Sequence, residues 1–173
     1  VPEDLLVQAN SLGLFMRPIA MFFIGPLLGG VLVDAFDGAA LAFLAFIAWL
    51  EGHPEESLAL SRESLALARR LDHPPVLTLA LMFAAQLRRL RGEAEATEEL
   101  AVESLALADA HGLSLFAAVD GMLCGWAQVE QGRFDAGIAG LHRSLDAYRA
   151  IGADSGLPQY FALLAEGYAR AGQ

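Results

Sequence analysis

The sequence has no lysine, a single cysteine and few β-branched residues. Because Cys124 is alone, the chain can form neither an internal disulfide nor a cysteine-rich metal site. Without lysine there is no Gly-x-x-x-x-Gly-Lys-Ser/Thr phosphate loop, and no Gly-x-Gly-x-x-Gly motif occurs either. The net charge of −10 argues against a nucleic-acid partner, since phosphate binding needs clustered basic side chains.

The scarcity of β-branched residues also bears on the fold class. Val, Ile and Thr together number 15, whereas Ala and Leu together number 63. Ala and Leu are strong helix formers, and β-branched residues favour strands. Hydrophobic residues make up 55% of the 173 residues, which is enough apolar surface to form a core. The composition therefore predicts an ordered, all-α chain.

An internal repeat with a period of 40 residues runs through most of the sequence. Gly52, Gly92, Gly132 and Gly172 follow one another at this spacing. Other columns in the same phase are Phe43, Phe83, Leu123 and Leu163, then Ser64, Ser104 and Ser144, each serine being followed by leucine. A fixed period of this length is typical of helical repeat arrays.

Each period is expected to form two antiparallel helices, because glycine and proline divide it into two apolar stretches. The expected helices cover residues 38–50, 55–71, 76–91, 94–110, 113–131, 134–151 and 157–171. The corresponding units are 37–72, 73–112 and 113–152, with a partial unit at 153–173. The predicted fold class is an α-α superhelix of antiparallel helix pairs.

Small residues recur where the two helices of a unit should cross. Ala45, Ala85, Gly125 and Ala165 form one such column on the first helices. Ser57, Thr97 and Gly137 form another at the start of the second helices. A large side chain at a close crossing would hold the helix axes apart, so both columns predict close helix contacts.

Residues 1–36 do not follow the period, and no charged residue lies between Pro18 and Val33. These sixteen residues are fewer than the roughly 20 that a membrane-spanning helix needs. We expect an irregular apolar segment, a degenerate helical repeat buried against the first regular repeat or against sequence beyond this chain. The alternatives are a membrane-facing helix through residues 11–33 and a disordered artefact of cloning or reading frame. The final helix lacks a second helix, so we also expect the chain to be a piece of a longer protein.

No constellation of residues indicates catalysis, and we expect no enzyme activity, cofactor or metal in this chain. The four histidines show no zinc-ligand spacing and are expected to be structural: His53, His73, His111 and His142. Cys124 is expected to be a small core residue. Four glutamates in the first turns of second helices should favour the helix dipole instead of acting as acids or bases: Glu55, Glu56, Glu98 and Glu99.

The spacing of small residues resembles the tetratricopeptide (TPR) repeat, although the period of 40 exceeds the usual length of about 34. Arg88 and Gln128 also stand where that family commonly has tyrosine. The resemblance implies a right-handed array whose first helices line a concave groove. Transferred by period, it implies a partner-binding groove of Phe46, Trp49, Leu79, Met82, Gln86, Arg89, Met122 and Trp126. The alternative is that these side chains pack inside a tightly wound array or against another domain of the parent protein.

From about Ala39 to Gln173 the sequence is similar to a more particular group, the C-terminal TPR-like arrays of large bacterial signalling proteins. Those proteins carry an AAA-type ATPase module and often a class III adenylate/guanylate cyclase domain. The similar stretches include 71–74, 83–85, 125–132, 147–153 and 163–168. Related arrays occur in transcription regulators of the maltose-activator type.

The resemblance implies a non-catalytic, cytoplasmic scaffold that forms the sensor or regulatory part of an ATPase- or cyclase-containing protein. Its expected partners are a protein, a peptide or other domains of the parent, with no nucleic acid and no membrane. A homo-oligomer through the unpaired helix at 157–171 is a further possibility. The alternative function is a small-ligand-binding effector domain of a transcription regulator.

Overall fold

The computed structural model describes the backbone of residues 32–172 and the side chains of residues 38–172. Within the described part there are only helices and no strands. They are α2 (Leu32–Leu50), α3 (Pro54–Leu71), α4 (Pro74–Leu90), α5 (Ala94–Ala110), α6 (Ser114–Glu130), α7 (Phe134–Ala150) and α8 (Leu157–Arg170). From Asp34 onward the chain forms one compact unit, which holds the described helices apart from the first two residues of α2.

The expectations for residues 1–31 lie outside the described residues. The helix expected from Gly38 already begins at Leu32, so α2 reaches into the stretch expected to be irregular. The other helices begin and end within two residues of the expected positions.

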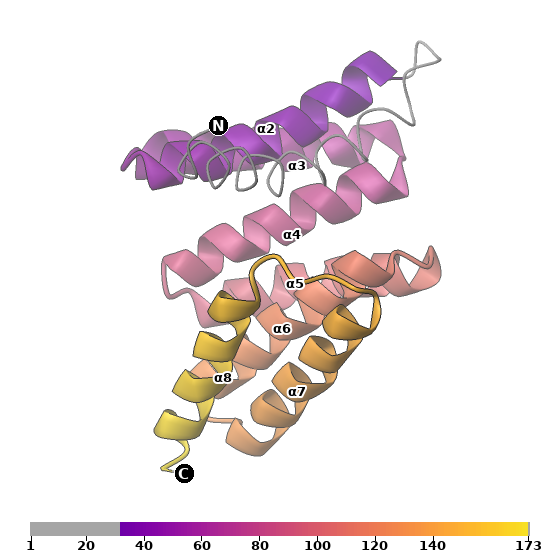
Figure 1. The fold of residues 1–173 in the computed structure, drawn as a ribbon. Coiled ribbons are helices and arrows are strands. Elements are labelled where there is room, and N and C mark those ends of the chain that lie inside the picture. The colour runs from indigo at the N-terminus through magenta and orange to yellow at the C-terminus, as the bar shows by residue number, and fades with distance from the viewer. Residues whose placement is uncertain (1–31, 173) are drawn as a thin grey trace, which may run out of the picture. The chain divides into compact units, whose positions relative to one another are not determined.

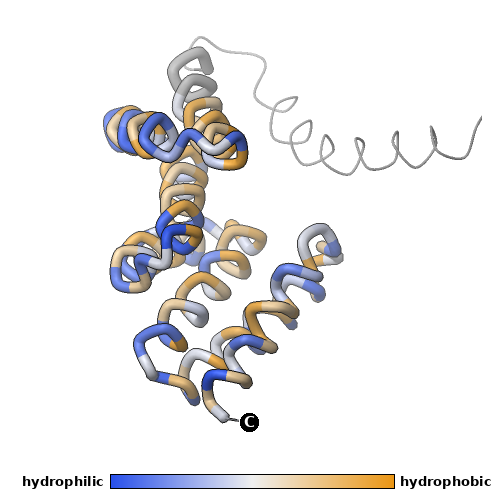
Figure 2. The backbone as a smooth tube through the Cα atoms, turned by 90° about the vertical axis from the view of Figure 1, so that its left-hand side faces the viewer, coloured by the Kyte–Doolittle hydropathy of each residue, from blue (hydrophilic) through white to orange (hydrophobic). Residues whose placement is uncertain are grey.

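The helices pack in chain order as antiparallel pairs (Figure 1), which confirms the predicted all-α superhelical repeat class. In the first pair, Ser57 at the start of α3 donates a hydrogen bond to the carbonyl of Ala45 near the end of α2. Ser64, two turns further along α3, donates to the carbonyl of Gly38 instead. Helices α2 and α3 are therefore antiparallel. Figure 2 shows hydrophobic and hydrophilic residues alternating around the helices, as expected of amphipathic elements.

The predicted glycine turns share one backbone conformation. Gly52, Gly92 and Gly132 have φ of 84°, 73° and 78°, in the left-handed region that glycine enters without a steric penalty. After each glycine, the next backbone N–H donates to a carbonyl five residues earlier, for example His53 to Ala48 at 2.8 Å. These bonds satisfy carbonyl groups at the helix end. Each first helix is thereby turned back onto its second helix in the same way.

The turns between units show one departure from this rule. Gly112 and Gly152 adopt positive φ where α5 and α7 end, and Asp72 occupies the equivalent position after α3. Asp72 is the one non-glycine residue with positive φ in the described part of the chain, at 48°. Aspartate is among the side chains that tolerate this region.

Close helix crossings occur where the small columns predicted them. A Cβ atom added to Gly125 would lie 2.9 Å from the carbonyl oxygen of Gly137 and from the backbone nitrogen of Leu141. One added to Gly137 would lie 2.7 Å from the carbonyl oxygen of Gly125. The backbones of α6 and α7 therefore touch, and only glycine fits on both sides.

The first and second helices of the pairs occupy different places in the array. The first helices, α2, α4, α6 and α8, are called A helices below, and α3, α5 and α7 are called B helices. Consecutive A helices contact one another: α4 contacts α6, and α6 contacts α8. The ring centroids of Phe43 on α2 and Phe83 on α4 lie 4.7 Å apart. In contrast, all Cα atoms of consecutive B helices lie more than 8 Å apart. The A helices thus form the more closely packed, inner row.

The hydrophobic core is unevenly distributed along the array. The largest cluster of buried side chains joins α6, α7 and α8 and includes Trp126, Leu141 and Leu163. The buried face of α3 instead contains three serines, one leucine and one alanine. The C-terminal half of the described array therefore holds most of the large buried side chains.

Candidate functional site

The predicted groove residues fall into two groups by burial. Phe46, Trp49, Leu79 and Met82, on α2 and α4, are half-buried and keep part of their side chains exposed. The ring of Phe46 packs edge-on against Phe83 at 5.8 Å. These four residues leave apolar surface along the A helices, as the groove hypothesis requires.

Met122 and Trp126, on α6, are buried to 1% and 6% exposure. Both belong to the core cluster that joins α6 to α8. For these two residues the structure places the side chains inside the array, as the alternative interpretation held. Replacing Trp126 would therefore disturb the fold and would not test binding alone.

Gln86 and Arg89, the two polar groove residues, lie together on α4. Arg89 donates from Nε to Oε1 of Gln86 at 3.3 Å, and its guanidinium carbon lies 5.9 Å from the ring centroid of Trp126. This is a cation–π arrangement between consecutive A helices. Burial lowers the pKa of Arg89 from its ordinary value, and the nearby Tyr160 and Glu166 of α8 partly oppose that shift.

Arg89 has no ion-pair partner in the described part of the chain. Several other arginines there have one: Arg69 pairs with Glu103, Arg88 and Arg91 with Glu93, and Arg170 with Glu130 and Glu166. Arg89 is therefore a half-buried cation beside an aromatic ring, without a carboxylate within ion-pair distance.

A buried polar cluster that the sequence reasoning missed lies between α4, α5 and α6. Asp120 is fully buried, and its Oδ2 accepts a hydrogen bond from Ser104 Oγ at 2.6 Å. Ser104 Oγ also lies 3.1 Å from the carbonyl of Thr78. Among the residues that the structure describes, Asp120 Oδ1 has no hydrogen-bond partner. Burial raises the pKa of Asp120 to about 8, and the Ser104 bond opposes this only partly. The sequence did contain one signal for this cluster, because Asp120 lies one and two periods after the small apolar residues Ala80 and Ala40.

The remaining candidate residues have structural surroundings. Cys124 is buried, and burial raises the pKa of its thiol to about 12, so the thiol stays protonated at neutral pH. Glu98 accepts hydrogen bonds from Gln131 and Arg133. His142 lies 2.7 Å from the hydroxyl of Tyr168 on α8. Among the described residues, no group of three or more His, Cys, Asp or Glu could hold a metal ion.

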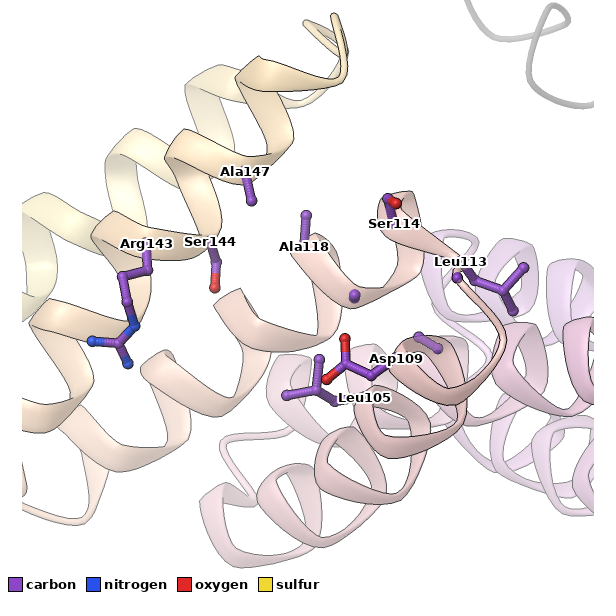
Figure 3. A pocket seen from close by; sticks show the side chains of 11 residues that line it. Leu105, Asp109, Leu113, Ser114, Ala118, Arg143, Ser144 and Ala147 are labelled. Atoms are coloured by element: carbon purple, nitrogen blue, oxygen red, sulfur yellow. The ribbon is translucent and has the colours of Figure 1, made fainter.

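A cleft of about 490 Å³ opens between α5, the start of α6 and α7 (Figure 3). It lies on the side of the B helices, whereas the predicted groove residues lie on the A helices. It is lined by Leu105, Ala108, Asp109, Gly112, Leu113, Ser114, Ala117, Ala118, Arg143, Ser144 and Ala147. No motif in the sequence pointed to it.

Comparisons with protein-family models, curated proteins and solved structures gave no match to this chain. The resemblance to arrays of bacterial signalling proteins therefore remains a prediction from the sequence. None of the helices between residues 32 and 172 has the length and apolar character needed to cross a bilayer.

Proposed function

We propose that the repeat array is a non-catalytic protein-interaction scaffold whose row of A helices binds a peptide segment of a partner. The observation that carries this proposal is Arg89, a half-buried cation without an ion-pair partner among the described residues. Removing water from a charged group costs free energy unless an opposite charge compensates it. A carboxylate supplied by a partner would provide that compensation.

The neighbouring side chains favour an apolar segment on either side of the carboxylate. Phe46, Trp49, Leu79 and Met82 keep exposed apolar surface on α2 and α4. Large aromatic residues and arginine are common anchors at protein interfaces. The proposed ligand is therefore a peptide with apolar side chains and one acidic group, which lies along the A helices.

The sequence resemblance supports a wider role in a larger signalling protein. There the array would act as the regulatory part of a cytoplasmic ATPase- or cyclase-containing chain, and would transmit partner binding to those modules. Phe161 on α8 is 48% exposed, which is compatible with the expected contact between two copies through this helix. Both statements remain predictions.

A selection from a random peptide display library tests the groove. We expect recovered peptides to combine apolar residues with an acidic residue or a free C-terminal carboxylate. Arg89→Gln should weaken their binding by tenfold or more, because the partner carboxylate loses its counter-charge. Trp49→Ala should weaken it through lost apolar contact. Fluorescence anisotropy on the purified chain measures both effects.

Arg70→Gln is the matched control, since Arg70 is an exposed arginine on a B helix and forms no ion pair with another described residue. It should leave peptide affinity unchanged. Equal affinities of the wild-type, Arg89→Gln and Arg70→Gln proteins for the recovered peptides would contradict the assignment.

A further inference from the structure

The array contains two equivalent joints between consecutive B helices, and they are filled differently. The first joint lies between α3 and α5, and the second lies between α5 and α7. Residues 40 apart in sequence occupy corresponding places in them.

At three positions of the second joint, alanine stands where the first joint has a larger residue. Alanines 117, 118 and 147 correspond to Leu77, Thr78 and Leu107. All three alanines line the cleft of about 490 Å³. Cavities of roughly 300–1,000 Å³ are typical of small-molecule sites. The cleft therefore follows from the sequence of this joint and not from the spacing of the helices alone.

Within the described residues, the ion pair that closes the first joint is absent from the second. In the first, Arg69 of α3 pairs with Glu103 of α5 at 3.0 Å. In the second joint, Asp109 occupies the position of Arg69, and Arg143 occupies the position of Glu103. The two charges are therefore reversed.

Neither Asp109 nor Arg143 forms an ion pair within residues 38–172, although both line the cleft. Ser144, which corresponds to Ser104, has no hydrogen bond in that range either. Figure 3 shows Asp109 and Arg143 on different helices, at two sides of the opening. The second joint thus presents one anionic, one cationic and one hydroxyl group to an open space.

We propose that this cleft binds a small zwitterion of the α-amino acid class. Its ammonium group would pair with Asp109 on α5, and its carboxylate would pair with Arg143 on α7. The Ser114 and Ser144 hydroxyl groups line the same cleft and offer further hydrogen bonds. A zwitterion offers a counter-charge to each of these two walls, which a ligand with a single charge does not.

Such a ligand would bridge α5 and α7, as Arg69 and Glu103 bridge α3 and α5 directly in the first joint. A bound ligand would then link consecutive units at the joint where no ion pair among the described residues connects α5 to α7. This site shares no lining residue with the predicted A-helix groove and does not depend on the proposed peptide binding.

The test uses the full chain and a panel of free α-amino acids, each at millimolar concentration, with their N-acetyl and methyl ester derivatives. Thermal unfolding and isothermal titration calorimetry give the readout. We expect at least one free amino acid to bind and to raise the melting temperature. Its N-acetyl and ester derivatives should bind tenfold or more weakly, because each lacks one charge.

Variants assign the binding to the cleft. Asp109→Asn and Arg143→Gln are changes at exposed positions and should each weaken binding by tenfold or more. The double variant Ala117→Leu/Ala147→Leu restores the leucines of the first joint and should abolish binding. Glu103→Gln, at the first joint, is the control and should leave amino-acid binding unchanged.

The absence of binding by every amino acid in the panel would overturn the proposal. So would binding that the Asp109 and Arg143 variants leave unchanged. Should the leucine variant fail to fold, as circular dichroism would reveal, the two charge variants still decide the outcome.

Discussion

At the scale of single residues, Asp120 is the side chain least compatible with its surroundings. It is fully buried, and one carboxylate oxygen has no hydrogen-bond partner within residues 38–172. A buried carboxyl group in this state favours its protonated form, which is the physical reason for the raised pKa. The protein should therefore lose stability as this group is forced to ionise.

The sign of the pH effect follows from the two pKa values. The pKa of Asp120 is about 8 in the folded protein, against an ordinary value of 3.8. Between these values the folded state binds more protons than the unfolded state, so stability falls as pH rises and levels off above about pH 8. We expect Asp120→Asn to flatten this fall, which can approach about 1.4 kcal/mol per pH unit. Urea unfolding measured from pH 5 to pH 9 gives the comparison.

Asp146→Asn serves as the control, because Asp146 is exposed on α7. This variant should keep the pH dependence of the wild-type protein. If Asp120→Asn shows the same slope as Asp146→Asn, the buried carboxyl group is not the cause.

At the scale of helices, the closest crossing depends on two glycines. Gly125 of α6 and Gly137 of α7 bring the two backbones into contact. Gly140, one turn further along α7, is less constrained, since a Cβ there would lie 3.6 Å from its nearest neighbour, the Gly125 Cα. Two glycines near the same crossing should therefore respond oppositely to alanine.

Gly125→Ala should lower the free energy of unfolding by about 1–3 kcal/mol, because α6 and α7 must move apart. Gly140→Ala should raise it by up to about 1 kcal/mol, because alanine favours a helix more than glycine does. Urea denaturation of both variants measures the two effects. Similar losses in both would show that close backbone contact is not what Gly125 provides.

The sequence predicted the helices well because glycine and proline mark most of their ends. Gly52, Gly92 and Gly132 ended the A helices within two residues of the positions found. The start of α2 at Leu32 was missed, since the period does not extend upstream of it. Asp72 was also missed as a left-handed residue, because its neighbours His73 and Pro74 gave a sufficient reason for the turn.

The candidate sites were less predictable than the helices. Phe46 and Trp49 are half-buried on α2, whereas Trp126 is covered, and transfer by period could not distinguish these two cases. Burial of Trp126 depends on how α8 packs against α6, which is a contact between units and not a property of one repeat. The cleft likewise depends on three helices together.

At the scale of the whole described array, stability should be unevenly distributed. The cluster around Trp126 joins α6, α7 and α8, whereas the buried face of α3 is rich in serine. Repeat arrays open locally, because each unit contacts only its neighbours. The units with the larger buried side chains should open last.

We expect the backbone amides of α3 to exchange with deuterium at least tenfold faster than those of α6, after correction for intrinsic rates. Hydrogen exchange followed by mass spectrometry under native conditions measures this difference. Uniform protection from α3 to α7 would indicate that the array opens as one cooperative unit instead.

The shared conformation of the glycine turns has a consequence for the length of the molecule. Because the chain passes through Gly52, Gly92 and Gly132 with nearly the same backbone angles, these positions are interchangeable junctions. Excising one forty-residue module between two of them, or duplicating it, would rejoin the chain in register. We expect duplication of such a module to lengthen the protein, and deletion of one to shorten it, without redesign of its loops.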